Sequence, residues 1–414
     1  MATTNAPDHL AKGQAFLENR QFPQAREHFF KILELFPTDP GLAQAVFGIG
    51  RSFMWERSYD TAIVYLDRAA REFPGTRYGE DGLSFKGASL VRLGKHSEAA
   101  SVYQQYVTMY PVGERVESAH TNIIDALREA GKYDDANSWV DKTLQKFPGE
   151  PVATNAMNSR LRMEIYRERW PAAIATSDAM IGSAKFAGTI TSMDEVKFLK
   201  GLALEKSGNT AAASATYSTV TNSLSSYFGT LASERLASIG SRRVAPLVTA
   251  KQMNDSPVVF RGELLQYSKK HDIDPRFLLA IMKQESGFRP DAKSPASARG
   301  LLQLVYDTAI KYNTAAGIGN IQPDDLFVPR TNIAIGTEYI AALKKQFGGL
   351  YEAIAASYNA GEDNAERWLA RSKPKEAGVF AAEVGFAETK NYVFKVMTNY
   401  RIYQEIYDKD LKKK

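Results

Sequence analysis

A repeat of 37 residues runs through the first part of the chain and limits its fold more than any other feature. Aromatic-proline pairs recur at this interval, at Phe36-Pro37, Phe73-Pro74, Tyr110-Pro111 and Phe147-Pro148. Two more columns keep the same register, one of ring side chains (Phe22, Tyr59, His96, Tyr133, Trp170) and one of alanines (Ala25, Ala62, Ala99, Ala136, Ala173). A fixed period of this size, with helical patterning and proline at the unit ends, indicates stacked helix-turn-helix units.

Segments 57–62 (RSYDTA) and 131–136 (GKYDDA) resemble the tetratricopeptide repeat, whose usual unit of about 34 residues is slightly shorter. We interpret the aligned columns as packing contacts between helices, because each unit must bury its face on its neighbours. Apolar residues follow helical spacing throughout, which predicts an all-α fold. We expect a superhelical solenoid over residues 1–240, a turn-rich linker over 241–257 and a helical domain over 258–414.

The composition excludes several classes of protein. A hydrophobic content of 44% and a charged content of 24% are typical of a globular chain. There is no cysteine, and the five histidines are scattered, so we expect no disulfide, no thiolate metal site and no zinc site. The net charge of +5 is not concentrated in a basic stripe, which argues against nucleic acid. No apolar run reaches about 18 residues, and the first residues lack the pattern of a signal peptide.

One carboxylate stands out in the second half of the chain. Asp274 and Pro275 predict the start of a helix, and Gly287 predicts its end. Glu285 falls on the apolar stripe of this helix, where loss of hydration favours the neutral acid and raises its pKa. A glutamic acid that keeps its proton near neutral pH can act as a general acid.

The residues alone leave a simpler alternative open for this glutamate. Perturbed carboxylates also arise in structural ion pairs. Lys283 and Arg289 are the local basic residues that would form such a pair with Glu285. The pattern therefore makes Glu285 a candidate for catalysis without deciding its role.

Four ordered motifs give this candidate a context. They are Glu285-Ser286 with Phe288, KSPASARGLLQL over 293–304, SYNAG over 357–361 with Trp368, and AETKNYV over 387–393. Segment 332–340, NIAIGTEYI, lies between the second and third motifs. With these motifs, residues 270–407 resemble the catalytic domain of the soluble lytic transglycosylases, which has a goose-lysozyme-like helical fold and cleaves peptidoglycan.

The resemblance assigns a role to each matching position. It implies that Glu285 is the single catalytic acid and base. Ser294 corresponds to a serine that hydrogen-bonds near the acid and the reacting sugar, and Gln303 lies in a loop that contacts sugar. Tyr358 corresponds to the tyrosine that positions the catalytic carboxyl. Glu388 corresponds to a second acidic residue of the cleft.

Five further residues are implied to support this site. Asn359 and Gly361 shape one wall of the groove, and Asn359 is expected to contact substrate. Ser286 and Gly300 belong to the first two motifs, and Tyr392 supports the helix that carries Glu388. The resemblance implies no metal and no cofactor.

The implied reaction cleaves the β-1,4 bond between N-acetylmuramic acid and N-acetylglucosamine. A single glutamate acts first as acid and then as base, and the C6 hydroxyl of the sugar closes onto C1 to form a 1,6-anhydromuramic end. Two alternatives stay open: a hydrolytic goose-type muramidase, and a non-catalytic glycan-binding scaffold. The expected partner is the peptidoglycan strand, which predicts action in the periplasm or cell envelope. The solenoid also offers a surface for a protein partner, or a means of restricting access to the cleft.

The chain departs from the family pattern at two places. The family usually has GLMQLMP where this chain has Leu302 for the first methionine, and Val305 and Tyr306 for the final Met-Pro. Glu362 and Asp363 replace the Pro-Gly that commonly follows the third motif. We expect an altered groove wall and turn after Leu304 and additional negative charge near the cleft.

Overall fold

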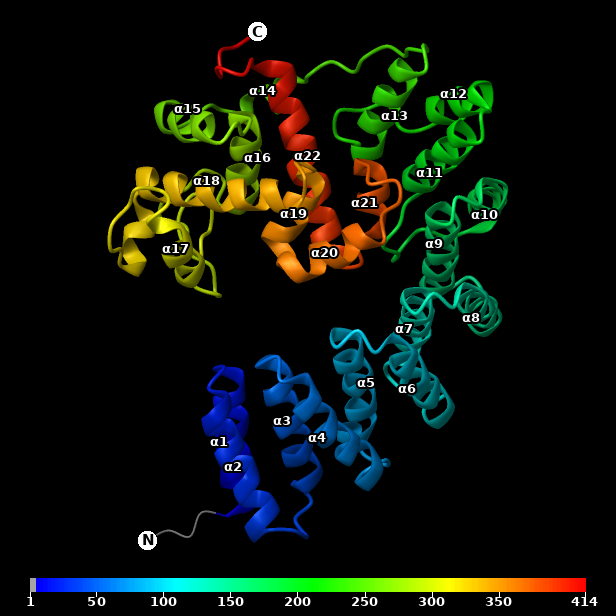
Figure 1. The fold of residues 1–414 in the computed structure, drawn as a ribbon, viewed down its shortest axis with the longest axis vertical. Helices are drawn as coiled ribbons and strands as arrows, with labels where there is room; N and C mark the ends of the chain where they lie inside the picture. The colour runs from blue at the N-terminus through cyan, green and yellow to red at the C-terminus, as the bar shows by residue number, and fades with distance from the viewer. Residues whose placement is uncertain (1–4) are drawn as a thin grey trace. The chain divides into compact units, whose positions relative to one another are not determined.

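The computed structural model describes residues 5–414 and has an all-α fold (Figure 1). Within this range the regular elements are helices, and β-structure is limited to isolated bridges such as Lys293 with Arg299. The predicted fold class is therefore confirmed. No helix between residues 5 and 414 combines the length and apolar character needed to cross a lipid bilayer.

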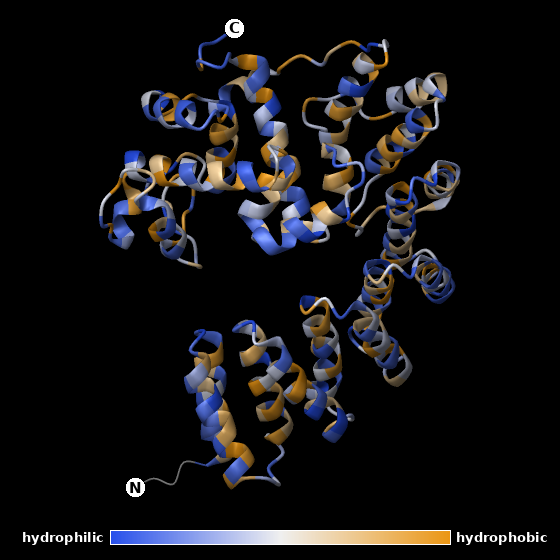
Figure 2. Cartoon of the chain, viewed as in Figure 1, coloured by the Kyte–Doolittle hydropathy of each residue, from blue (hydrophilic) through white to orange (hydrophobic). Residues whose placement is uncertain are grey.

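The chain divides into two compact units, residues 1–163 and 164–414. Paired helices build the first unit: α1 (Ala6–Glu18), α2 (Phe22–Leu35), α3 (Leu42–Trp55), α4 (Tyr59–Glu72), α5 (Arg77–Arg92), α6 (His96–Met109), α7 (Val116–Glu129) and α8 (Tyr133–Lys146). Each of these helices combines hydrophobic and hydrophilic residues (Figure 2). The unit boundary falls within α9 (Pro151–Tyr166).

The repeat columns occupy equivalent places in the helical units. Residues of the ring column begin the second helix of each pair, as Phe22 begins α2 and Tyr59 begins α4. Every alanine of the alanine column is fully buried. The aromatic residues of the aromatic-proline pairs follow directly after the second helices, as Phe36 follows α2. This arrangement supports the interpretation of the columns as packing contacts.

The second unit begins well before the expected domain boundary at residue 240. Its first helices are α10 (Trp170–Ser183), α11 (Met193–Lys206), α12 (Thr210–Ser218) and α13 (Tyr227–Ser238). They share one compact unit with the C-terminal helices because aromatic side chains join them. The ring of Tyr227 on α13 stacks on Phe394, with centroids 4.8 Å apart. Phe228 meets the same ring edge-on at 5.4 Å.

The C-terminal part of this unit contains shorter helices around one long helix. They are α14 (Ala250–Asn254), α15 (Arg261–Lys270), α16 (Pro275–Glu285), α17 (Tyr306–Asn313), the 3-10 helix η1 (Pro323–Phe327), α18 (Pro329–Gln346), α19 (Tyr351–Ala360), α20 (Glu362–Ala370), α21 (Ala377–Glu383) and α22 (Ala387–Ile406). Helix α22 packs against α16, α19 and α13 (Figure 1).

Helix α16 begins and ends as its sequence predicts. The Asp274 carboxylate accepts a hydrogen bond from the Arg276 N–H at 3.0 Å, and Pro275 occupies the first helical position. Glu285 is the last helical residue, and Gly287 has the left-handed φ of +58°. The local signals therefore place Glu285 where α16 meets the loop that carries the second motif.

Candidate active site

The carboxyl group of Glu285 is largely buried between α16 and α22. The Tyr392 hydroxyl on α22 donates a hydrogen bond of 2.5 Å to Glu285 Oε1. Burial raises the pKa of Glu285 to about 7, and the Tyr392 hydrogen bond, which stabilises the carboxylate, partly opposes this rise. The predicted rise in pKa is confirmed, so Glu285 can hold or release a proton near neutral pH.

The two local basic residues have other hydrogen-bond partners. Lys283 Nζ donates to the Ser256 hydroxyl at 3.3 Å, and Arg289 Nε donates to the Ser286 carbonyl at 3.1 Å. Over residues 5–414, neither side chain forms an ion pair with Glu285. The structural ion pair considered from the sequence is therefore not present.

The tyrosine whose hydroxyl contacts the carboxyl is Tyr392, and the expected role of Tyr358 in positioning Glu285 stays a prediction. Tyr358 on α19 instead donates to the Leu302 carbonyl at 2.6 Å. Both tyrosines lie on helices beside α16, but the Tyr358 hydroxyl reaches the loop that follows α16 rather than Glu285. Burial and, to a smaller extent, the charge of Glu285 raise the pKa of Tyr358 well above its usual value. Tyr358 therefore stays protonated and anchors this loop.

A third tyrosine lies next to Tyr358. Tyr339 on α18 packs against Tyr358 with ring centroids 5.3 Å apart. Burial raises the pKa of Tyr392 as well, again with a smaller effect of Glu285. All three tyrosines therefore stay neutral at physiological pH. Tyr339 lies inside the NIAIGTEYI motif, although no role was predicted for it from the sequence.

The loop after α16 is held by buried polar contacts. The Ser286 hydroxyl donates to the Leu301 carbonyl at 2.8 Å. Asn332 on α18 is fully buried, and its side-chain oxygen accepts a hydrogen bond from the Leu302 N–H at 2.8 Å. The amide nitrogen of Asn332 donates to the Arg299 carbonyl at 3.0 Å and to the Leu326 carbonyl at 2.8 Å. Asn332 is thus a second supporting residue that was not predicted from the sequence, although the NIAIGTEYI motif contains it.

Gly300 lies at the tightest point of this loop. Its φ is +75°, and a Cβ added there would lie 2.1 Å from the Leu326 carbonyl oxygen and 2.4 Å from Asn332 Nδ2. Only glycine combines this backbone conformation with so close an approach. The supporting role expected for Gly300 therefore has a steric reason.

Ser294 and Gln303 form hydrogen bonds within the loop itself. The Ser294 hydroxyl accepts a hydrogen bond from the Ala298 N–H at 3.1 Å. Gln303 Nε2 donates to the Ala292 carbonyl at 3.0 Å and to the Gly300 carbonyl at 2.9 Å. Both side chains stabilise the loop, and their contacts with sugar stay predictions.

The third and fourth motifs meet between α19 and α22. Asn359 is exposed, and its side-chain oxygen accepts a 2.7 Å hydrogen bond from the buried Thr389 hydroxyl. Gly361, with φ of +87°, ends α19 and begins α20. Glu388 is exposed in the first turn of α22, four residues before Tyr392 and so on the same side of the helix.

The two departures from the family pattern lie at the starts of helices. Val305 is exposed before α17, and Tyr306, the first residue of α17, donates to the Ile321 carbonyl at 2.8 Å. Glu362 and Asp363 form the first turn of α20. Between residues 5 and 414, no group of three or more histidine, aspartate and glutamate side chains is arranged to hold a metal ion.

Comparison with known families identifies both parts of the chain. Residues 264–380 match the transglycosylase SLT domain, and residues 10–76 and 86–151 match the tetratricopeptide repeat. The soluble lytic murein transglycosylases of Salmonella typhimurium and Escherichia coli K12 are each 34% identical to this chain over 143 residues. This alignment covers 34% of the chain and only 22% of either relative.

Two solved structures have a similar fold. One is an inactive mutant of the lytic transglycosylase Slt from Pseudomonas aeruginosa, with a TM-score of 0.56 and 17% identity, covering 96% of this chain and 81% of that one. The other is the complex of the 70-kDa soluble lytic transglycosylase with bulgecin A, with a TM-score of 0.57 and 17% identity, covering 97% and 81% of the two chains. The chain therefore carries a transglycosylase SLT domain that follows an array of tetratricopeptide repeats.

Proposed function

We propose that this protein is a peptidoglycan lytic transglycosylase. It cleaves the β-1,4 bond between N-acetylmuramic acid and N-acetylglucosamine and leaves a 1,6-anhydromuramic end. The observation that carries this proposal is the buried Glu285 of the SLT domain, whose pKa of about 7 lets it serve as acid and as base. The names of the relatives that match this domain support the choice of substrate.

The reaction begins with proton transfer to the leaving sugar. Protonated Glu285 donates its proton to the glycosidic oxygen, and the bond to C1 of N-acetylmuramic acid breaks with development of positive charge on the ring. The transferred proton becomes the hydrogen of the new C4 hydroxyl group on the departing N-acetylglucosamine. Tyr392 donates a hydrogen bond to the carboxylate that forms, which moderates its basicity.

The second half of the reaction returns the proton to Glu285. The carboxylate accepts the proton of the C6 hydroxyl as O6 bonds to C1 and closes the anhydro ring. An intramolecular nucleophile benefits from proximity, and no water is consumed. This order of reaction steps differs from the hydrolytic mechanisms of most glycosidases, in which a second carboxylate acts as nucleophile or base.

The test is product analysis on purified peptidoglycan with wild type, Glu285→Gln and Glu388→Gln. We expect anhydromuropeptides from wild type and from Glu388→Gln, and no product from Glu285→Gln. Products heavier by one water would instead identify a hydrolytic muramidase. Binding of glycan strands without any product would identify a scaffold.

The cell envelope is the proposed site of action, since that is where peptidoglycan lies. Bulgecin A, which is bound in one of the similar structures, provides a probe that does not depend on turnover. We expect wild type and Glu285→Gln to bind it in calorimetry. A folded wild type without bulgecin binding or product release would contradict the proposal.

A further inference from the structure

A buried ion pair joins α11 to α22, close to the tyrosine that contacts Glu285. Lys390 Nζ lies 2.9 Å from Glu195 Oε1 and 2.8 Å from Oε2. The two side chains are 3% and 0% exposed. Glu195 and Lys390 are 195 residues apart in the sequence, so this contact links α11 to the helix that carries Tyr392.

An ion pair is an uncommon way to join two buried helices. The loss of hydration offsets much of the attraction between the charges, and apolar residues of similar volume often stabilise a fold equally well. What a buried pair adds is a fixed geometry, because each charge must stay against its partner. The Glu195–Lys390 contact therefore restricts where the first turns of α22 can lie relative to α11.

Lys390 and Tyr392 point to different sides of α22. Residues two apart on a helix are separated by about 200° around its axis and do not face each other. On one side of α22, Lys390 pairs with Glu195, and the Thr389 hydroxyl donates a 2.7 Å hydrogen bond to Asn359 Oδ1. The opposite side presents the Tyr392 hydroxyl to Glu285. The first turns of α22 are thus fixed from two directions while they contact the acid.

We propose that Glu195 is a positioning residue for the reaction. Through Lys390 it fixes the first turns of α22 and thereby holds the Tyr392 hydroxyl against Glu285. The inference rests on the proposed function, and it adds that α11, which lies outside residues 264–380 of the SLT domain, contributes to the site.

A double-mutant cycle tests this route of action. Glu195→Gln, Tyr392→Phe and the double variant are compared by initial rates on soluble glycan strands. We expect Glu195→Gln to lower kcat by ~10-fold while KM stays nearly constant, because a misplaced group chiefly affects the reacting geometry. In the Tyr392→Phe background the same substitution has no further effect on kcat, since the contact it acts through is already absent.

The pH profile provides a second readout that a general loss of stability would not move. Tyr392 is the hydrogen-bond donor that lowers the pKa of Glu285. Removing or misplacing it raises that pKa, so the alkaline limb of kcat moves to higher pH in Glu195→Gln and in Tyr392→Phe alike. Losses that multiply in the double variant, or an alkaline limb that stays in place in Glu195→Gln, would overturn the proposal.

Two further variants separate positioning from folding. Glu195→Gln combined with Lys390→Met removes both charges, so no unpaired charge stays buried, and we expect it to fold and to show the same kcat loss. A folded double variant with wild-type kcat would also overturn the proposal. The control is Glu234→Gln on α13, which removes the 3.3 Å pair with Arg401 later on α22 and should leave kcat unchanged.

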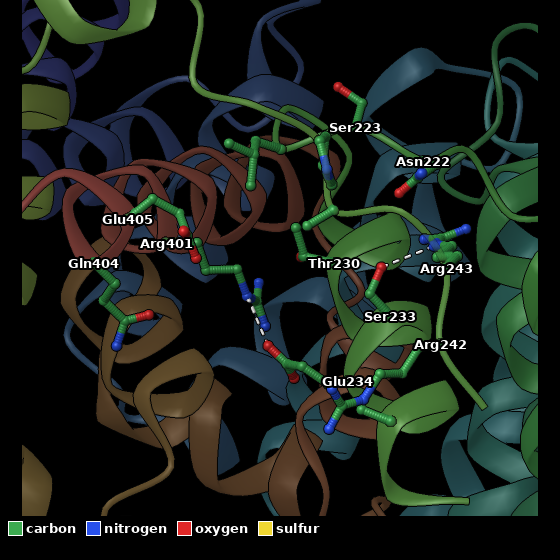
Figure 3. A pocket seen from close by; sticks show the side chains of 14 residues that line it. Asn222, Ser223, Thr230, Ser233, Glu234, Arg242, Arg243, Arg401, Gln404 and Glu405 are labelled. Carbon is green, nitrogen blue, oxygen red and sulfur yellow. Dashed lines mark hydrogen bonds and ion pairs between the residues drawn. The ribbon is translucent and has the colours of Figure 1, made fainter. Parts of the chain in front are cut away.

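The control pair has a different setting. Glu234 is 61% exposed, and with Arg401 it lines a cavity of about 300 Å³ between α13, the segment after it and α22 (Figure 3). None of the predicted site residues lines this cavity. Failure of the proposed function would appear differently, as a wild type without activity on peptidoglycan.

Discussion

The raised pKa of Glu285 predicts that this carboxyl group destabilises the fold at neutral pH. The pKa of about 7 in the folded protein compares with 4.5 for an ordinary glutamate. At ~1.4 kcal/mol for each pH unit, this difference corresponds to about 3 kcal/mol. Glutamine has a similar shape and stays neutral, so Glu285→Gln removes this contribution.

The sign of the effect follows from which state ionises first. Below about pH 4.5 the carboxyl of Glu285 is protonated in both the folded and the unfolded state. The ionisation of Glu285 therefore causes little difference between the free energies of unfolding of wild type and Glu285→Gln. Between pH 4.5 and 7 the unfolded chain releases its proton while the folded protein retains it, so rising pH favours unfolding. Above about pH 7, Glu285→Gln should be more stable than wild type by about 3 kcal/mol, as an upper estimate.

The assay must follow the second unit separately, because a two-unit chain need not unfold in one step. Urea unfolding with pulsed hydrogen exchange of peptides from α16 and α22 provides this separation. Glu388→Gln, at an exposed position, is the matched control, and its difference in free energy of unfolding from wild type should not increase with pH. Two outcomes would contradict the claim that burial raises the pKa of Glu285. One is a difference in free energy of unfolding between Glu285→Gln and wild type that stays constant from pH 4.5 to 8. The other is a Glu285→Gln variant that is less stable than wild type at pH 8.

Three further predictions concern the surroundings of the site. Tyr392→Phe should move the alkaline limb of kcat up by about one pH unit or more, because a hydrogen bond to a charged group contributes about 1.5–3 kcal/mol; an unchanged limb would contradict the contact. Gly300→Ala should lower the free energy of unfolding, measured in urea, by about 2–4 kcal/mol, because alanine is strained at this positive φ and its Cβ would clash with the Leu326 carbonyl oxygen. An unchanged free energy of unfolding would contradict this steric effect. A fragment of residues 164–414 should fold by circular dichroism and release product, whereas 258–414 should lose most activity; equal activity would show that α10–α13 are dispensable.

The features that the sequence predicted well depend on local signals. The ring and alanine columns recur in every unit, and each occurrence reports the same place in a helix pair, as Tyr59 and Ala62 do in α4. The bounds of α16 were predictable from Asp274 and Gly287 for the same reason, since capping involves neighbouring residues. The burial of Glu285 followed from its register on that helix.

The features that were missed depend on contacts between distant segments. The turn-rich segment over 241–257 suggested a linker there, but the contact of Glu195 with Lys390, which joins α11 to α22, leaves no local mark in the sequence. A motif likewise indicates that Tyr358 and Tyr392 belong to one site, but it does not indicate which hydroxyl reaches the carboxyl. That choice depends on how α19 and α22 pack, which only the folded structure provides.

The position of Glu285 as the final residue of α16 has a further consequence. The last carbonyl groups of a helix point their partial negative charges toward its C-terminal end. A carboxylate there is repelled by the backbone in addition to losing hydration, so the helix itself favours the return of a proton. For a residue proposed to give up a proton and then recover one within the same turnover, the end of the helix resets the acid for the next cycle.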